Sequence, residues 1–166
     1  RGVTGWELGG VGGADPGEIW AVGSAGTILR WNGTAWRVEA EDGWQGWRSV
    51  WGSARDDVWV VGDRGRVMHW DGTSWTAAES GTTLGLTAIS GAAGDDVWAV
   101  GDGGVILHWG GSEWVVAAAG SDWIDWGWYD VWAVSGGRAW FGSITGDAAY
   151  WDGAAWVERT HFCGPD

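Results

Sequence analysis

Four tryptophans stand outside the regular pattern of this chain and could bind a ligand. They are Trp6, Trp44, Trp123 and Trp126, and the nearest acidic residues are Glu41, Asp42, Asp122 and Asp125. An exposed indole ring can cover the apolar C–H face of a sugar, while carboxylates accept hydrogen bonds from the sugar hydroxyls. This combination predicts a carbohydrate site. In the alternative interpretation, the four rings only fill gaps between unequal structural units.

Catalytic chemistry has little support in the sequence. There is no G-x-S-x-G nucleophile motif, no phosphate-binding P-loop and no H-E-x-x-H metalloprotease motif. The single cysteine, Cys163, lies in the C-terminal tail, and the nine arginines are scattered along the chain without any lysine. We therefore expect a binding protein that is not an enzyme and that carries no cofactor.

Two histidines and several aspartates recur at equivalent positions. His69 and His108 correspond to Arg30 and Tyr150 in other segments, so we expect a strand position that faces solvent or an interface, not a metal site. The recurring acids are Asp56, Asp57, Asp63, Asp95, Asp96 and Asp102. Aspartate favours turns and caps, which is the interpretation we prefer, and a calcium site is the alternative.

Three tryptophans recur at constant spacing in four segments. The segments are EIWAVGSAGTILRWNGTAW, DVWVVGDRGRVMHWDGTSW, DVWAVGDGGVILHWGGSEW and RAWFGSITGDAAYWDGAAW. The recurring residues are Trp20, Trp31, Trp36, Trp59, Trp70, Trp75, Trp98, Trp109, Trp114, Trp140, Trp151 and Trp156. Steps of 39, 39 and 42 residues separate the copies, which is the period of a repeat architecture. We expect one domain with repeats at 1–41, 42–80, 81–120 and 121–162, followed by a tail at 163–166.

Each repeat is predicted to form four short antiparallel strands. The expected inward-facing residues of the first strands are Leu8, Val11, Trp47, Val50, Leu86, Ile89, Trp128 and Val131. The third and fourth strands are separated by Asn32-Gly33, Asp71-Gly72, Gly110-Gly111 and Asp152-Gly153, which are typical of two-residue hairpin turns. Because such sheets must pack on one another, the sequence predicts an all-β fold, a β-propeller built from four Trp-rich four-stranded repeats. Four blades could close alone, two chains could make a ring of eight, or the chain could belong to a longer array.

The pattern x-V-W-A-V-(x)5-I-x-x-W-x-G-x-x-W, followed by runs such as LTAISGAAGDDVWAVG, resembles tectonin-type repeats of propeller lectins from animals and bacteria. The resemblance covers nearly the whole chain and implies a propeller that binds carbohydrate. The chain departs from that pattern in having fewer blades and, in its last copy, a third strand that is less apolar. Its AVG-(x)-GxI runs are also similar to those of photosystem-assembly propellers, which implies an assembly role. A weaker likeness links DGTSW to the Asp-box of sialidase-type propellers.

The charge of the chain restricts its partners. A net charge of −13 disfavours nucleic acid and anionic membranes, and no apolar stretch is long enough to predict a membrane span. The chain begins at Arg1, which indicates a processed or excised form, and we expect a secreted or cell-surface protein. The leading hypothesis is a multivalent, lectin-like protein that binds glycans. The alternative is a non-catalytic scaffold or assembly subunit that docks on another protein, or on its own copies, through a Trp-rich rim.

Overall fold

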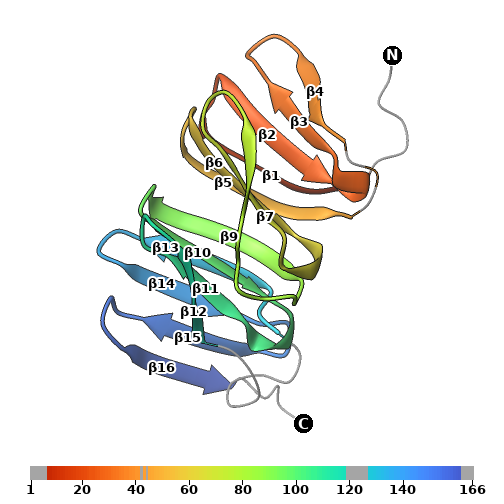
Figure 1. Ribbon diagram of the computed structural model, residues 1–166. Coiled ribbons are helices and arrows are strands. Elements are labelled where there is room, and N and C mark those ends of the chain that lie inside the picture. The colour runs from red at the N-terminus through yellow and green to blue at the C-terminus, as the bar shows by residue number, and fades with distance from the viewer. Residues whose placement is uncertain (1–6, 42, 44, 119–126, 162–166) are drawn as a thin grey trace.

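The computed structural model describes residues 7–41, 43, 45–118 and 127–161. These residues form four antiparallel sheets of four strands each, and the strands of every sheet follow one another in chain order. Figure 1 shows the sheets as a fan that runs from the N-terminal sheet to the C-terminal sheet. The predicted β-propeller fold, with one blade for each repeat, is confirmed. No helix in the described part of the chain is long and apolar enough to cross a membrane.

Each blade is a meander of four strands. Blade 1 contains β1 (Leu8–Asp15), β2 (Glu18–Gly23), β3 (Ile28–Trp31) and β4 (Trp36–Ala40). Blade 2 contains β5 (Trp47–Ala54), β6 (Asp57–Gly62), β7 (Val67–Trp70) and β8 (Trp75–Ala78). Blade 3 contains β9 (Leu86–Ala93), β10 (Asp96–Gly101), β11 (Ile106–Trp109) and β12 (Trp114–Ala118). Blade 4 contains β13 (Asp130–Val134), β14 (Arg138–Gly142), β15 (Asp147–Trp151) and β16 (Trp156–His161).

The turns between the third and fourth strands differ from the prediction. Trp31 pairs with Trp36 across the first of them, so the connection has four residues where the sequence predicted two. The Asn32 side chain explains the longer turn, because its Oδ1 accepts hydrogen bonds from the backbone N–H groups of Thr34 and Ala35 at 3.1 and 3.0 Å. In blades 2 and 4, Asp71 and Asp152 make the same kind of turn.

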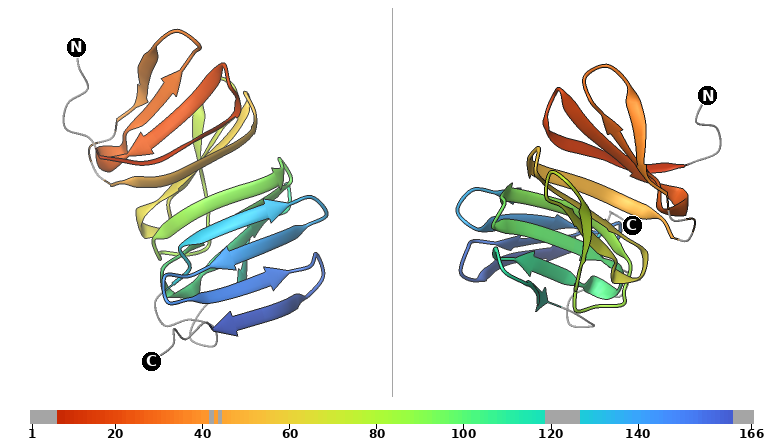
Figure 2. Two further views of the ribbon diagram at one scale, coloured as in Figure 1. Left: turned by 180° about the vertical axis from the view of Figure 1, so that it is seen from behind. Right: turned by 45° about the horizontal axis from the view of Figure 1, so that its top comes forward.

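The apolar core is divided into layers, each lying between two consecutive blades. Trp20 and Val22 of blade 1 pack with Val58 and Val60 of blade 2. The equivalent residues of blade 2 pack on blade 3, and those of blade 3 pack on blade 4. The inner strands also pack in order, β1 on β5, β5 on β9 and β9 on β13, as Figure 2 shows along one side of the fan. Burial in each blade therefore depends on its neighbours.

The inward-facing role predicted for Leu8 and Val11 is wrong, because these side chains are 55% and 71% exposed. Their equivalents in blades 2 to 4 are buried. Blade 1 has no preceding blade in this structure, and among the described strands β1 makes no contact with β13 comparable to those between consecutive inner strands. Ala21 and Leu29, in the middle of the face of blade 1 that no blade covers, are buried. Only the edges of that face are therefore exposed. The four blades form an open arc.

Candidate functional site

The predicted carbohydrate-site residues Trp6, Asp42, Trp44, Asp122, Trp123, Asp125 and Trp126 all lie outside the described residues. The carbohydrate site therefore stays a prediction. Among the described residues, a hollow of about 420 Å³ lies between blades 2 and 3 and includes Gln45, the residue after Trp44. Its lining residues are Gln45, Asp63, Arg64, Thr83, Gly85 and Asp102, and none of these is aromatic.

A second hollow, of about 410 Å³, crosses the four inner strands. Its lining residues are Gly9, Gly10, Val11, Arg48, Ser49, Thr87, Ala88, Tyr129 and Asp130. Each blade contributes the same two positions of its repeat, blade 1 adds Val11, and the two shared positions carry a different residue in every blade. The volume lies within the range of ligand sites, which is about 300–1,000 Å³. This hollow is our candidate functional site.

Hydroxyl groups fix the inner strands that line the hollow. Oγ of Ser49 accepts a hydrogen bond from the backbone N–H of Ile89 at 3.3 Å, which joins blade 2 to blade 3. Oγ1 of Thr87 donates to the carbonyl oxygen of Trp128 at 2.8 Å, which joins blade 3 to blade 4. Since these bonds cross from blade to blade, they hold the hollow in one shape before any ligand arrives.

Arg48 is the cationic group of the hollow. Its Nε donates to Oδ1 of Asp63 at 2.7 Å, and Oδ2 of the same carboxylate accepts from the backbone N–H of Gly46 at 3.1 Å. The terminal nitrogens of Arg48 make no other hydrogen bond to the residues that the structure describes. The carboxylate thus orients the guanidinium and leaves donors for a ligand.

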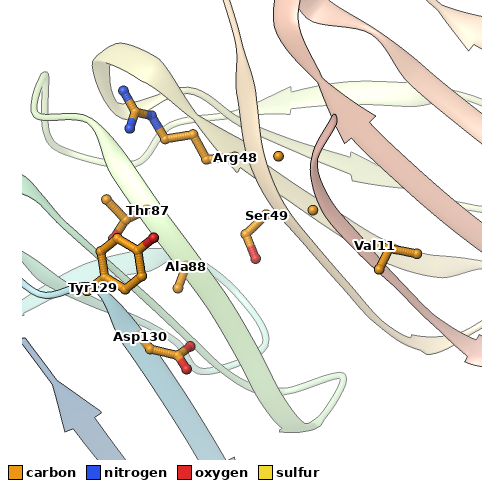
Figure 3. Close-up of a pocket in the computed structure, with 9 residues that line it drawn as sticks. Val11, Arg48, Ser49, Thr87, Ala88, Tyr129 and Asp130 are labelled. Atoms are coloured by element: carbon orange, nitrogen blue, oxygen red, sulfur yellow. The ribbon is translucent and has the colours of Figure 1, made fainter. Parts of the chain in front are cut away.

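Tyr129 and Asp130 occupy the blade 4 side of the hollow. Figure 3 shows Tyr129 beside Thr87, with Arg48 above them, Asp130 below them and Val11 on the far side of the group. The Tyr129 side chain is 65% exposed, although it belongs to a residue type that usually covers part of its ring. Asp130 is exposed, its Oδ1 accepts from the backbone N–H of Val131 at 2.9 Å, and no described cation forms an ion pair with it. The hollow therefore offers an aromatic ring, hydrogen-bond donors and an available carboxylate.

Both recurring histidines, and the aspartates opposite them, have structural partners. In blade 2, Nε2 of His69 lies 2.7 Å from Oδ1 of Asp57, the imidazole stacks on Trp59, and Trp59 Nε1 donates to the same oxygen at 3.1 Å. Burial raises the pKa of Asp57, but hydrogen bonds from His69, Ser53 and Trp59 lower it by a larger amount. The pKa therefore lies below its ordinary value. Blade 3 repeats the arrangement with His108.

The other two blades replace this network with different pairs. Blade 1 has an ion pair between Arg30 and Glu18 at 2.8 Å, and blade 4 has Tyr150 stacked on Trp140. No group of three His, Cys, Asp or Glu side chains that could hold a metal ion occurs among the described residues. Of the recurring aspartates, Asp57, Asp63 and Asp96 accept hydrogen bonds from neighbouring side chains or backbone N–H groups.

The sequence contained a signal for the hollow that the search for unusual tryptophans missed. Arg48, Thr87 and Tyr129 occupy one repeat position, directly after the residue equivalent to Trp47. The preceding residue is apolar in every blade, whereas this position changes from glycine to a cation, a hydroxyl and a phenol. A position that varies in chemistry beside constant core positions indicates a surface used for something other than packing.

A scan against models of protein families finds no match, and a search of curated proteins finds none either. Solved structures do match. YCF48 bound to D1 peptide has a TM-score of 0.67 at 16% identity, over 94% of this chain and 53% of that chain. Virginiamycin B lyase from Staphylococcus aureus has a TM-score of 0.74 at 16% identity, over 93% and 55%. The RRP9 WD40 repeats have a TM-score of 0.71 at 14% identity, over 95% and 54%.

Identities this low show the fold alone, and the fold they show is the β-propeller. The chain spans little more than half the length of each of these solved structures. This proportion agrees with an open arc of blades.

Proposed function

We propose that this chain is a non-catalytic docking module that binds an extended, basic segment of another protein in the hollow across its inner strands. The observation that supports the proposal is that Arg48, Tyr129 and Asp130 line one hollow, from two adjacent repeat positions, on inner strands that hydrogen bonds join. Tyrosine and arginine are enriched among the residues that carry binding energy at protein interfaces. The proposal assigns the scaffold interpretation of the sequence to this hollow.

The shape of the hollow favours a peptide. The hollow crosses all four inner strands, and its lining includes the backbone of Gly9 and Gly10. A peptide in extended conformation can follow such a lining and offer backbone groups to Arg48 and Tyr129. One of the similar structures, YCF48, is bound to a peptide, which makes the peptide the first ligand class to test.

The charges favour a basic segment. Arg48 is paired with Asp63, whereas Asp130 has no described cationic partner, so the hollow itself leaves a negative charge available. The net charge of −13 adds a field that attracts cationic partners and speeds their encounter. A Lys or Arg side chain of the partner would pair with Asp130, while an adjacent residue of the same partner segment would pack on the Tyr129 ring.

Carbohydrate binding, which the resemblance to tectonin-type repeats implies, stays a prediction that rests on residues outside the described ones. It places the ligand on the rim beside Trp44 and Trp126. The two proposals therefore differ both in the class of ligand and in the location of the site, and a single set of variants can separate them.

The test is selection from a random peptide library, followed by fluorescence anisotropy with the enriched peptides. We expect enriched peptides to be basic and Tyr129→Ala to weaken them at least about tenfold, as loss of an interfacial aromatic does. Asp130→Asn should reduce the salt dependence of binding, because one ion pair is removed.

Val115→Ala is the matched control, because Val115 is exposed on the outer strand β12, away from the hollow. Peptides that bind this variant and the two hollow variants equally well would overturn the location. A parallel glycan array covers the rival hypothesis. Saturable glycan binding that is lost in Trp44→Ala or Trp126→Ala, with no peptide enriched, would replace the docking proposal by the carbohydrate one.

A further inference from the structure

The contact between blades 2 and 3 consists of two tryptophan knobs and a surface that receives them. The Trp59 ring contacts both Trp109 and Trp114 of blade 3, with centroids 4.8 and 5.4 Å away. Trp51 lies on Gly91 of blade 3, where an added Cβ would come within 2.5 Å of the indole. A glycine is therefore required beneath this knob. Blade 2 supplies the knobs, and blade 3 supplies two indoles and a glycine.

Blade 4 carries the same two knobs with nothing described on top of them. Trp132 and Trp140 are the repeat equivalents of the blade 2 knobs and lie directly opposite each other on β13 and β14. They are 65% and 41% exposed. Tyr150 stacks on Trp140 at 4.2 Å, much as His69 stacks on its tryptophan in blade 2 at 4.1 Å. We call Trp132, Trp140 and Tyr150 the knob face.

Blade 1 carries the receiving surface. Gly13, Trp31 and Trp36 are the repeat equivalents of the blade 3 residues that receive the knobs, and we call them the seat face. The Trp31 and Trp36 rings lie 5.8 Å apart at 50°, compared with 5.9 Å and 45° for the pair in blade 3. Gly13 is exposed, and Trp36 is 44% exposed. The seat face thus has the same geometry as the blade 3 surface that blade 2 covers, although no preceding blade covers the seat face in the structure.

We infer that a second copy of this chain docks head to tail, with the knob face of each copy on the seat face of the other, and completes a propeller ring. The assembly would have two identical contacts, related by a twofold axis through the centre of the propeller. Head-to-tail contacts between unlike surfaces form a closed ring in this way. Because the chain covers 53–57% of the solved propellers it resembles, two copies supply enough blades for a ring of that kind.

The occupant is specified by side chains, not only by exposed apolar area. An inner-strand tryptophan knob occurs in blades 2 and 4 alone, whereas the same position is Gly12 in blade 1 and Ser90 in blade 3. Ser90 makes a different contact, since its Oγ accepts from the backbone N–H of Ala133. A blade with two knobs needs a glycine and two indoles opposite it, and blade 1 of a second copy presents all three. Both faces are already ordered, so little conformational entropy is lost on docking.

Light scattering and sedimentation equilibrium of the 166-residue chain test the inference. We expect a mass of twice the 17.7 kDa of one chain. Trp132→Ser on the knob face and Trp36→Ser on the seat face should each weaken association at least about 30-fold, the effect of losing an interfacial tryptophan worth about 2 kcal/mol. Val115→Ser, which removes an exposed apolar side chain from β12 outside both faces, should leave the mass unchanged.

Mixing Trp36→Ser with Trp140→Ser tests the head-to-tail arrangement. These two rings would contact each other as Trp59 contacts Trp114, so a mixed pair loses this ring contact once, whereas a dimer of either variant alone loses it twice. The mixed pair keeps one contact with both faces intact, formed by the seat face of the Trp140→Ser chain and the knob face of the Trp36→Ser chain. We expect dimers in the mixture at concentrations where each variant alone is monomeric. Far-UV circular dichroism of each variant must match that of the wild type, which the exposure of both side chains leads us to expect.

Three results would overturn the inference. One is a wild-type chain of 17.7 kDa throughout the micromolar range. Another is a dimer whose mass is unchanged in both tryptophan variants. The third is a mixture that stays monomeric, because a dimer of like faces, knob on knob or seat on seat, gains nothing from mixing. Peptide binding in the hollow can succeed or fail in any of these cases, so the two proposals are tested separately.

Discussion

Trp98 and Trp140 occupy the same position in consecutive repeats, yet one is 2% and the other 41% exposed. Both lie on the second strand of a blade, and each stacks on an aromatic side chain of the third strand at 4.1 or 4.2 Å. Their own blades therefore treat them alike. The difference comes from the next blade, because Phe141 and Trp151 of blade 4 cover Trp98, while no described residue covers Trp140 in this way.

The same lesson applies at the other end of the fan. Leu86 is fully buried between blades 2 and 3, whereas its repeat equivalent Leu8 is 55% exposed. In a repeat protein, the stabilisation that a side chain provides comes largely from the interface with its neighbour, not from the unit that contains it. Interior and terminal blades should consequently respond very differently to equivalent substitutions.

The largest expected effect contrasts a covered tryptophan with an uncovered one. Trp59→Ala removes a fully packed ring between blades 2 and 3 and should lower the free energy of unfolding by ~3–5 kcal/mol. Trp140→Ala, measured in the Trp132→Ser background so that a second copy contributes nothing, should cost less than about 2 kcal/mol. Denaturant unfolding followed by far-UV circular dichroism gives both values. Equal losses of unfolding free energy would show that these tryptophans stabilise the fold through contacts within their own blade, not through contacts with the next blade.

A smaller effect contrasts the polar networks of blades 2 and 4. The pKa of Asp57 is lowered in the folded chain from its ordinary 3.8, so the carboxylate stabilises the fold above about pH 4 and loses this effect as the pH falls through the lowered value. Asp57→Asn should cost about 1 kcal/mol at pH 7, since the site is only partly buried. The difference from wild type should shrink steadily toward pH 2.

Arg138→Gln is the control for this prediction, because Arg138 holds the position of Asp57 in blade 4 and bonds only to the carbonyl oxygen of Ser135 among described residues. Its cost should be below about 0.5 kcal/mol and independent of pH. Urea unfolding at a series of pH values measures both variants. A difference between Asp57→Asn and wild type that stays constant down to pH 2 would contradict the assignment.

Much of the fold could be predicted from the sequence, because the recurring positions are the packing positions. Trp20, Trp59 and Trp98 mark the same position in the first three repeats, and each is buried against the next blade. What the repeat pattern lacks is information about the ends. Leu8 has the same apolar character as Leu86, and only the arrangement of the blades determines that no blade covers it.

The candidate hollow escaped prediction for a related reason. Tyr129 and Arg48 are more than eighty residues apart in sequence, and they share one surface only because successive inner strands pack in order around the arc. The search for chemistry followed unusual residues, whereas this site is made of ordinary ones at a constant repeat position. The hairpin length was missed because a side chain, that of Asn32 or Asp71, shapes the turn more strongly than the glycine that follows.

These hairpins offer the finest comparison between blades. Blade 3 has Gly110 where blade 1 has Asn32, and its turn lacks the side-chain acceptor that the other three blades possess. An added Cβ at position 110 meets no atom within 4 Å, so a side chain fits there. Gly110→Asn should raise the free energy of unfolding by ~0.5–1 kcal/mol, because it restores the turn and restricts the unfolded chain. Asn32→Gly should lower the free energy of unfolding by a similar amount, and thermal unfolding of both variants measures the pair. If Gly110→Asn changes nothing while Asn32→Gly is destabilising, the acceptor matters only at the end of the fan, where no preceding blade supports the hairpin.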